Sequence, residues 1–226
     1  MSGTFHAGRL KDFISEWRNL TSDTSILDMV EHMHIEFYDQ PPVQDNFSVP
    51  QQFFNAQEQK IIDKEINELL KQGIIVTADY EHGQFISPIF LRHKKNGEYR
   101  LILNLKKFNE HVPYYHFKMD TFESALNLVS KNMYFCSVDI RHAYYSVPIA
   151  EEHQKYLRFR WKDNLFQFTC LPNGLCCGPR KYTKLMKPVY AKLRNDGHIC
   201  TGFIDDSLLG GNTHEECEQN VQETTA

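Results

Sequence analysis

Two adjacent carboxylates close an apolar run near the C-terminus, in the segment Phe203-Ile204-Asp205-Asp206. A second apolar run, ending in Gly210-Gly211, follows directly. Apolar runs on both sides of a short polar stretch predict a β-hairpin with the acids at its tip. Acidic pairs in loops are most often solvated turns. Here no Lys or Arg occurs from residue 201 to the end, so the two charges would repel each other at the edge of a core unless a cation compensates them.

A third acid, Asp139, closes another strand-like run at residues 133–139. Three carboxylates on neighbouring strand ends make a site for hard divalent cations, because Mg²⁺ takes oxygen ligands and is usually held by one or two carboxylates plus substrate phosphates. A pair of such ions about 3.5–4 Å apart recurs in polymerases and nucleases. The sequence therefore predicts a magnesium site built from both strand ends.

Charge is unevenly distributed along the 226 residues, although the formal net charge is only −4. Residues 92–107 carry six Lys or Arg against one Glu, and residues 178–194 carry six more and no acid. Residues 203–226 carry six Asp or Glu and no base. One basic segment alone would indicate a solvated face. Basic surfaces beside an acidic metal-type pocket suit a polyanionic substrate whose reacting end needs cations.

The six cysteines include no C-x-x-C pair, and no His cluster has zinc spacing. Several lie in apolar runs, where a thiol behaves as a small hydrophobe, so they indicate a reducing compartment and not a disulfide framework. No apolar run reaches 18 residues, and the N-terminus lacks the basic and apolar regions of a secretory signal. We expect an intracellular protein, cytoplasmic or nuclear, that is not secreted and has no membrane partner.

Hydrophobic periodicity predicts helices and paired strands without regular βαβ alternation, which indicates an α+β fold. Gly73 supplies a helix stop, and Pro188 is expected to strain or kink a helix because it lacks a backbone donor. Helices are expected at residues 9–19, 22–31, 56–72, 121–131 and 179–194, with another starting at Thr213. Extended segments are expected at residues 46–54, 84–92, 99–105, 133–139, 155–161, 165–171 and 199–209, with an Asn-Gly turn at 95–98.

Four segments in one order resemble the reverse transcriptases of retroviruses and long-terminal-repeat (LTR) retroelements. They are KKNGEYR at 94–100, SVDIRHAYYSVPI at 137–149, LPNGLCCGP at 171–179 and FIDD at 203–206. The resemblance covers about residues 57–220 and implies the fingers and palm of a right-hand polymerase, with an antiparallel palm sheet backed by helices. The upstream run from Gly8-Arg9-Leu10 to Pro41-Pro42 is similar to the leader of DIRS-like retrotransposons, and Asn104 supports that subfamily.

The resemblance assigns roles residue by residue. It implies that Asp139, Asp205 and Asp206 are catalytic and bind two Mg²⁺ ions, with Mn²⁺ as an alternative, and that the backbone carbonyl of Ile140 is a further metal ligand. The nucleotide-binding residues it implies are Lys94 (or Lys95), Arg100, Tyr144 and Asn173. Tyr144 would lie under the sugar and exclude a 2′-hydroxyl, whereas Tyr145 would face the core. Basic residues after Gly178, namely Arg180, Lys181, Lys184 and Lys187, are candidates to contact the template backbone.

The implied domains are a leader at residues 1–56 and incomplete fingers and palm at 57–226, truncated before the thumb and ribonuclease H domains. The implied function is RNA-directed DNA polymerisation for a retrotransposon. The implied partners are an RNA or DNA template, a DNA primer and deoxynucleoside triphosphates, with other element-encoded proteins as further candidates. Two alternatives stay open: an inactive remnant that binds nucleic acid or element proteins, and a metal-dependent nuclease, which explains neither Tyr144 nor the 171–179 turn.

Overall fold

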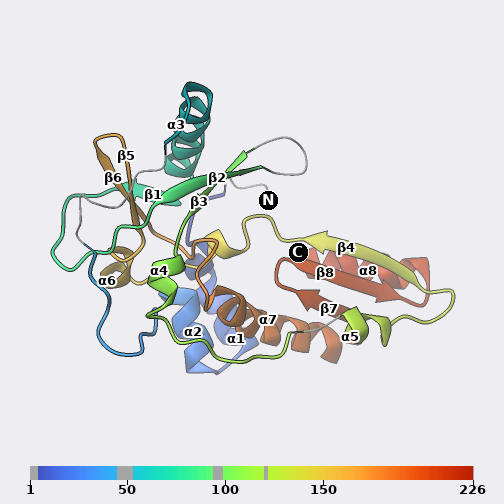
Figure 1. The fold of residues 1–226 in the computed structure, drawn as a ribbon. Helices are drawn as coiled ribbons and strands as arrows, with labels where there is room; N and C mark the ends of the chain where they lie inside the picture. Colours follow the sequence, from blue (N-terminus) through green and yellow to red (C-terminus); the bar gives the residue numbers. More distant parts are fainter. Residues whose placement is uncertain (1–4, 45–52, 94–98, 120–121, 226) are drawn as a thin grey trace. The chain divides into compact units, whose positions relative to one another are not determined.

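The computed structural model describes residues 5–44, 53–93, 99–119 and 122–225. The chain forms two compact units, and each is discontinuous in sequence. The first unit is built from Met1–Ile14, Asp28–Tyr114 and Tyr144–Gly178, and the second from Ser15–Leu27, Tyr115–Ala143 and Pro179–Ala226. Figure 1 follows the chain by colour through both units. None of the described helices combines the length and apolar character needed to cross a bilayer.

Helices and strands come in a mixed order along the chain. The helices are η1 (Arg9–Phe13), α1 (Ile14–Leu20), α2 (Thr24–Glu31), α3 (Ala56–Lys71), α4 (Lys106–Asn109), α5 (Phe122–Leu126), η2 (Tyr144–Ser146), α6 (Glu151–Gln154), α7 (Gly178–Asn195) and α8 (His214–Thr225). The strands are β1 (Ile75–Thr77), β2 (Ile89–His93), β3 (Tyr99–Leu103), β4 (Tyr134–Asp139), β5 (Arg158–Trp161), β6 (Asn164–Phe168), β7 (Ile199–Phe203) and β8 (Asp206–Gly211).

The first unit contains the sheet β1-β6-β5 and the hairpin β2-β3, both antiparallel. Its core includes the fully buried rings of Phe108 and Phe159. Helix α3 begins at a capping box, in which the Asn55 side chain accepts the backbone N–H of Glu58 while the Glu58 carboxylate accepts that of Asn55. The helix gives way at Gly73, whose φ of 67° favours glycine.

The N-terminal segment is hydrogen-bonded into the first unit by its backbone. Met33 forms an isolated parallel bridge with Ile149, and Gln44 forms another with Phe85. The Gly8 N–H donates to the carbonyl of Tyr145. Residues 5–14 and 28–44 are therefore an integral part of the first unit.

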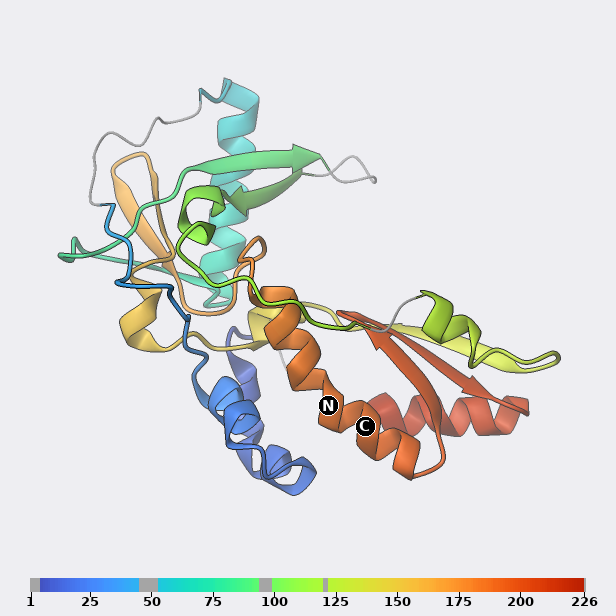
Figure 2. The same ribbon diagram turned by 60° about the horizontal axis from the view of Figure 1, so that its bottom comes forward.

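The second unit contains the antiparallel sheet β4-β8-β7, with α7 and α8 against it (Figure 2). Val138 pairs with Ser207, which pairs with Gly202. Directly paired residues point to the same side of a sheet, so this row faces the helices, as Tyr190 of α7 confirms by bonding Ser207. The core here joins Tyr190, Leu193, Cys200 and Leu209, with Val221 of α8 packed against them.

Most predicted elements are confirmed, among them the helix that contains Pro188, and one predicted helix is shorter than expected. Helix α5 ends at Leu126, well before residue 131, because the next N–H groups, those of Leu128 and Val129, donate to carbonyls three residues back and so tighten the last turn. Helix α7 runs from Gly178 to Asn195 with Pro188 inside it, since buried Leu185 and Leu193 anchor it on both sides of the missing N–H. The predicted turn at 95–98 and most of the extended segment at 46–54 lie outside the described residues. All six cysteines are free thiols.

Candidate active site

The aspartates occupy two adjacent strand ends of the second unit. Asp139 is the last residue of β4 and pairs directly with Asp206, the first residue of β8. Asp205 lies in the two-residue turn between β7 and β8, and its carbonyl accepts the N–H of Ile140 at 2.8 Å. Backbone pairing therefore brings all three acids to one edge of the sheet.

Asp139 and Asp206 point away from α7 and α8. Side chains alternate along a strand, and their neighbours Val138 and Ser207 face the helices. Phe203, which pairs with Asp206, shares the aspartates' face and is 49% exposed. The carboxylates of Asp139 and Asp206 thus lie on the sheet face that α7 and α8 do not cover. Their oxygens are the ligand type that Mg²⁺ prefers.

The three carboxylates do not form a tight cluster in the structure. Their oxygens do not all lie within 4.8 Å of one another. Among the described residues, the ligand atoms of His34, Glu152 and His153 meet that distance. Like charges repel, so a compensating cation is needed to close such a trio. The carbonyl of Ile140, a predicted ligand, accepts a turn hydrogen bond from Ala143 at 3.2 Å and retains a second lone pair.

The turn that carries Asp205 has unusual backbone geometry. Ile204 has a φ of 58°. Positive φ is rare for any residue other than glycine, and a β-branched residue such as isoleucine in this region is a genuine outlier. The first position of a two-residue hairpin turn with positive φ normally takes asparagine, aspartate or glycine. Such strain costs about 1–3 kcal/mol and persists only where the surroundings over-determine it, as they do at functional sites.

In the first unit, Arg100 lies on β3 directly opposite Arg92 of β2, and both side chains are exposed. Like charges directly opposite each other destabilise a hairpin, so this pair favours an anion between the two guanidinium groups. Lys94 and Lys95 lie outside the described residues.

Tyr144 and Tyr145 lie on the short helix η2, so their side chains are not separated by strand alternation. The ring of Tyr144 lies beside Gly178, where a Cβ would be 3.6 Å from it. The Asn173 amide donates to the Tyr145 hydroxyl at 3.2 Å, and burial raises the pKa of Tyr145 to about 12. Asn173, a predicted nucleotide contact, is thus oriented by a neutral phenol.

Comparison with known proteins decides the family. The model of the family described as reverse transcriptase (RNA-dependent DNA polymerase) matches residues 92–226, which is more than half of the chain. The chain belongs to the reverse transcriptase family.

Relatives and structural neighbours agree with this. The Transposon Tf2-3 and Tf2-7 polyproteins of Schizosaccharomyces pombe are each 20% identical over 216 residues, which is 95% of this chain and 16% of the polyprotein. The native protease-reverse transcriptase of prototype foamy virus matches with a TM-score of 0.66 and 21% identity, over 86% of this chain and 24% of that one. Its CSH mutant matches with a TM-score of 0.70 and 20% identity, over 95% and 28%. The neighbours show that the fold is the fingers and palm of a polymerase.

A basic surface groove of about 640 Å³ lies within the second unit of this reverse transcriptase. The guanidinium of Arg180 stacks 4.6 Å from the ring centre of Tyr115, and Lys184 is held by the Asp23 carboxylate at 3.9 Å and by the Ser25 hydroxyl. One wall comes from residues 21–26 of the N-terminal segment. The cationic groups along the groove are those of Lys118, Arg180, Lys184 and Lys187.

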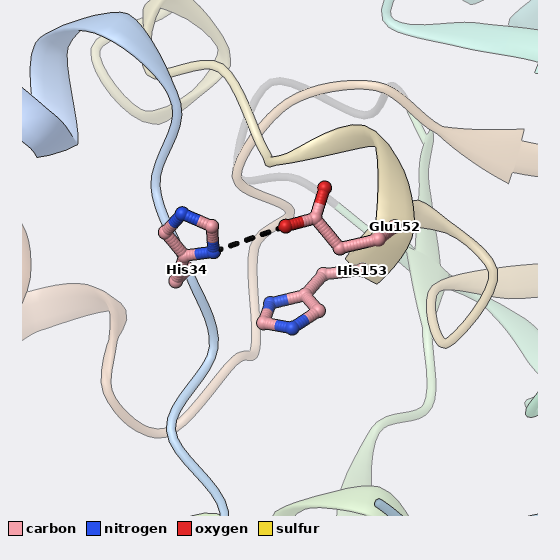
Figure 3. Close-up of side chains that lie close together, drawn as sticks. All are labelled: His34, Glu152 and His153. Carbon is pink, nitrogen blue, oxygen red and sulfur yellow. Dashed lines mark ion pairs between the residues drawn. The ribbon is translucent and has the colours of Figure 1, made fainter.

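A second polar cluster, which the sequence analysis missed, joins His34, Glu152 and His153 in the first unit (Figure 3). Their ligand atoms lie within 4.8 Å of one another, and His34 Nδ1 is 3.4 Å from Glu152 Oε1. However, His153 Nδ1 already accepts the backbone N–H of Ile35 at 2.9 Å. Neutral His153 then carries its proton on Nε2, which leaves no lone pair for a metal. We interpret the cluster as a docking contact for the N-terminal segment.

Proposed function

We propose that the chain is the fingers and palm of an RNA-directed DNA polymerase of an LTR-type, DIRS-like retrotransposon, and that it is catalytically competent. The observation that supports this best is the pairing of Asp139 with Asp206 beside Asp205, on a sheet face left open by the helices. The DIRS-like assignment rests on the leader resemblance and on Asn104.

In this proposal Asp139, Asp205 and Asp206, with the Ile140 carbonyl, hold two Mg²⁺ ions, and Mn²⁺ can replace them. When bound, the ions lower the pKa of the primer 3′-hydroxyl and neutralise charge on the leaving pyrophosphate. The aspartates fix the positions of the metals through the strand pairing, which is the positioning that phosphoryl transfer requires.

The nucleotide is held by residues of the first unit. Arg100 offers a forked donor to the triphosphate, with Arg92 opposite it and Lys94 as a further candidate. Tyr144 lies under the sugar and excludes a 2′-hydroxyl, and Asn173 contacts the nucleotide from its bond with Tyr145. These roles follow the motif resemblance.

The proposed partners are an RNA or DNA template, a DNA primer, deoxynucleoside triphosphates and other element-encoded proteins. The basic groove supports a nucleic-acid partner, because clustered cations interleaved with an aromatic ring suit a phosphate backbone. The six free thiols fit an intracellular location, cytoplasmic or nuclear. We retain residues 1–56 as the leader and 57–226 as the polymerase.

Primer extension on an RNA template tests the function. With Mg²⁺ and deoxynucleotides, we expect incorporation by the unchanged chain and a loss of at least about a hundredfold in Asp205→Asn and Asp139→Asn. Asp163→Asn, in the exposed β5-β6 turn, is the isosteric control and should retain activity. Equal incorporation by all four proteins would reject the metal assignment.

The same assay separates the alternatives. The groove alone would support binding without synthesis, so salt-sensitive binding with no extension at any Mg²⁺ or Mn²⁺ concentration would favour the inactive remnant. Mg²⁺-dependent shortening of the template, lost in Asp205→Asn, would favour a nuclease.

A further inference from the structure

A buried hydrogen bond lies directly behind the aspartate hairpin. The Tyr190 hydroxyl of α7 and the Ser207 hydroxyl of β8 are 2.7 Å apart, and the two residues are 7% and 4% exposed. Ser207 follows Asp206 in the chain but faces the opposite side of the sheet. The contact therefore restrains the backbone that carries Asp206 without touching the carboxylate.

Gly202 makes room for this contact. It pairs with Ser207 across β7 and β8, and a Cβ at Gly202 would lie 2.0 Å from the Tyr190 hydroxyl oxygen and 2.1 Å from Cζ. Real Cβ atoms do not approach so closely, so any side chain here would displace the ring or the strand. Gly202 has no left-handed φ, so the close approach of the tyrosine is the reason for glycine at this position.

Further contacts bind the same part of α7 to β7. Arg194 Nε donates to the Cys200 carbonyl at 3.1 Å, and its guanidinium lies 5.9 Å from the ring centre of Tyr190. The hairpin beyond them carries the strained Ile204. A strained turn keeps one conformation only where its base is fixed.

We infer that Tyr190, Ser207 and Gly202 form a lock that fixes the β7-β8 hairpin and so sets the spacing of Asp205 and Asp206 from Asp139. Tyr190 is thus a positioning residue for the metal site, acting through the backbone from the covered face of the sheet. This inference rests on the proposed function.

Removal of a single hydroxyl tests the lock. In Tyr190→Phe we expect the Mg²⁺ concentration for half-maximal extension to rise about tenfold, while the KM for deoxynucleotide stays within about twofold. Ser207→Ala should do the same, and the double variant should lose no more than either single one, because the two hydroxyls act as one unit. Tyr156→Phe, a buried tyrosine packed on Phe37 in the first unit, is the matched control and should leave both values unchanged.

Mn²⁺ binding followed by electron paramagnetic resonance gives a readout independent of synthesis. Affinity should fall about tenfold in Tyr190→Phe and should not change in Tyr156→Phe. Gly202→Ala tests the steric part: it should weaken Mn²⁺ binding more than Tyr190→Phe, and adding Tyr190→Leu should recover part of the loss.

The outcomes separate the lock from the proposed function. If Asp205→Asn abolishes synthesis while Tyr190→Phe and Ser207→Ala keep unchanged metal requirements, the lock is wrong and the function stands. If Asp205→Asn changes neither synthesis nor Mn²⁺ binding, the function itself fails. Should Tyr190→Phe fail to fold, the Ser207→Ala result decides the inference in the same way.

Discussion

Arg100 and Arg92 illustrate how a single cross-strand pair can be tested. Arg100→Ala should raise the deoxynucleotide KM about tenfold or more, because a charge-assisted contact to the triphosphate is lost. Arg92→Ala should have a smaller effect on KM and should stabilise the ligand-free protein by a few tenths of a kcal/mol, since it removes a like charge opposite Arg100. Single-nucleotide incorporation and thermal melting measure the two effects. Lys71→Gln, on the exposed surface of α3, is the control for lost positive charge.

Arg158 is the buried charge on which the first unit depends. It is 4% exposed and donates to the side chains of Gln84, Gln167 and Glu81. Arg158→Met should lower the free energy of unfolding by about 3 kcal/mol, because it leaves buried amides unpaired. Arg158→Lys should recover little, since an ammonium cannot reproduce the forked geometry.

Urea unfolding measures the loss, and Lys162→Met is the matched control on the same hairpin. Lys162 makes an exposed ion pair with Asp63 and lies 5.7 Å from the ring centre of Trp161, so its removal should cost only about 1 kcal/mol. Equal losses in Arg158→Met and Lys162→Met would show that the buried network contributes nothing specific.

At this scale the sequence reveals residues that carry recognisable chemistry and hides those that work through packing. The placement of Asp139, Asp205 and Asp206 at neighbouring strand ends could be predicted because acids after apolar runs stand out, and their role as metal ligands stays a prediction. Tyr190 and Gly202 could not, since neither residue type signals a contact between a helix and a strand that only tertiary structure brings together.

At the scale of elements, the segment around His34 docks on α6 through a pH-sensitive contact. Burial and the neighbouring His34 lower the pKa of His153, which accepts the Ile35 N–H only when neutral. Just below the ordinary histidine pKa, the unfolded chain therefore binds more protons than the folded one. The free energy of unfolding keeps the full contribution of this contact above that pH and decreases as the pH falls below it.

Melting temperatures measured between about pH 5 and 8 should show this decline, and His153→Gln should flatten it. The other charged groups around His153 are His32, His34, Glu152 and Lys155. His6→Gln is the control, because it also removes an exposed histidine ion pair, the one to Asp12, and leaves the Ile35 bond and the groups around His153 in place. A decline that persists unchanged in His153→Gln would contradict the prediction.

Helices and strands with strong local signals could be predicted from the sequence, whereas the residues at which they end often could not. The stop at Gly73 and the hairpins follow from turn and capping residues. The helix across Pro188 was predicted, whereas the early end of α5 depends on a tightening of the backbone after Leu126 that periodicity does not reveal.

At the scale of the whole molecule, the groove should govern salt-dependent binding. Charge reversal in Lys187→Glu or Lys118→Glu should weaken binding of a labelled single-stranded RNA and lower the slope of log affinity against log salt by about one per lost phosphate contact. Fluorescence anisotropy at several salt concentrations measures both. Lys192→Glu, also on α7 but outside the groove lining, is the control. An unchanged slope in both groove variants would exclude the groove from nucleic-acid contact.

The sequence did not predict that each unit is built from three separate stretches of the chain, because that depends on which distant segments pair. The chain passes from one unit to the other after residues 14, 27, 114, 143 and 178, and composition changes only at the last of these, where the basic segment 178–194 begins. The sequence division at residue 56 stays a prediction.

The parallel bridges Met33–Ile149 and Gln44–Phe85 make the N-terminal segment a structural partner of residues encoded far downstream. Exchanging this segment between two related elements would require matched partners at both bridges. Chimaeras joined near residue 56 should therefore express poorly unless residues 84–86 and 148–153 are exchanged with it. The N-terminal segment and the segments with which it pairs must then change together in evolution.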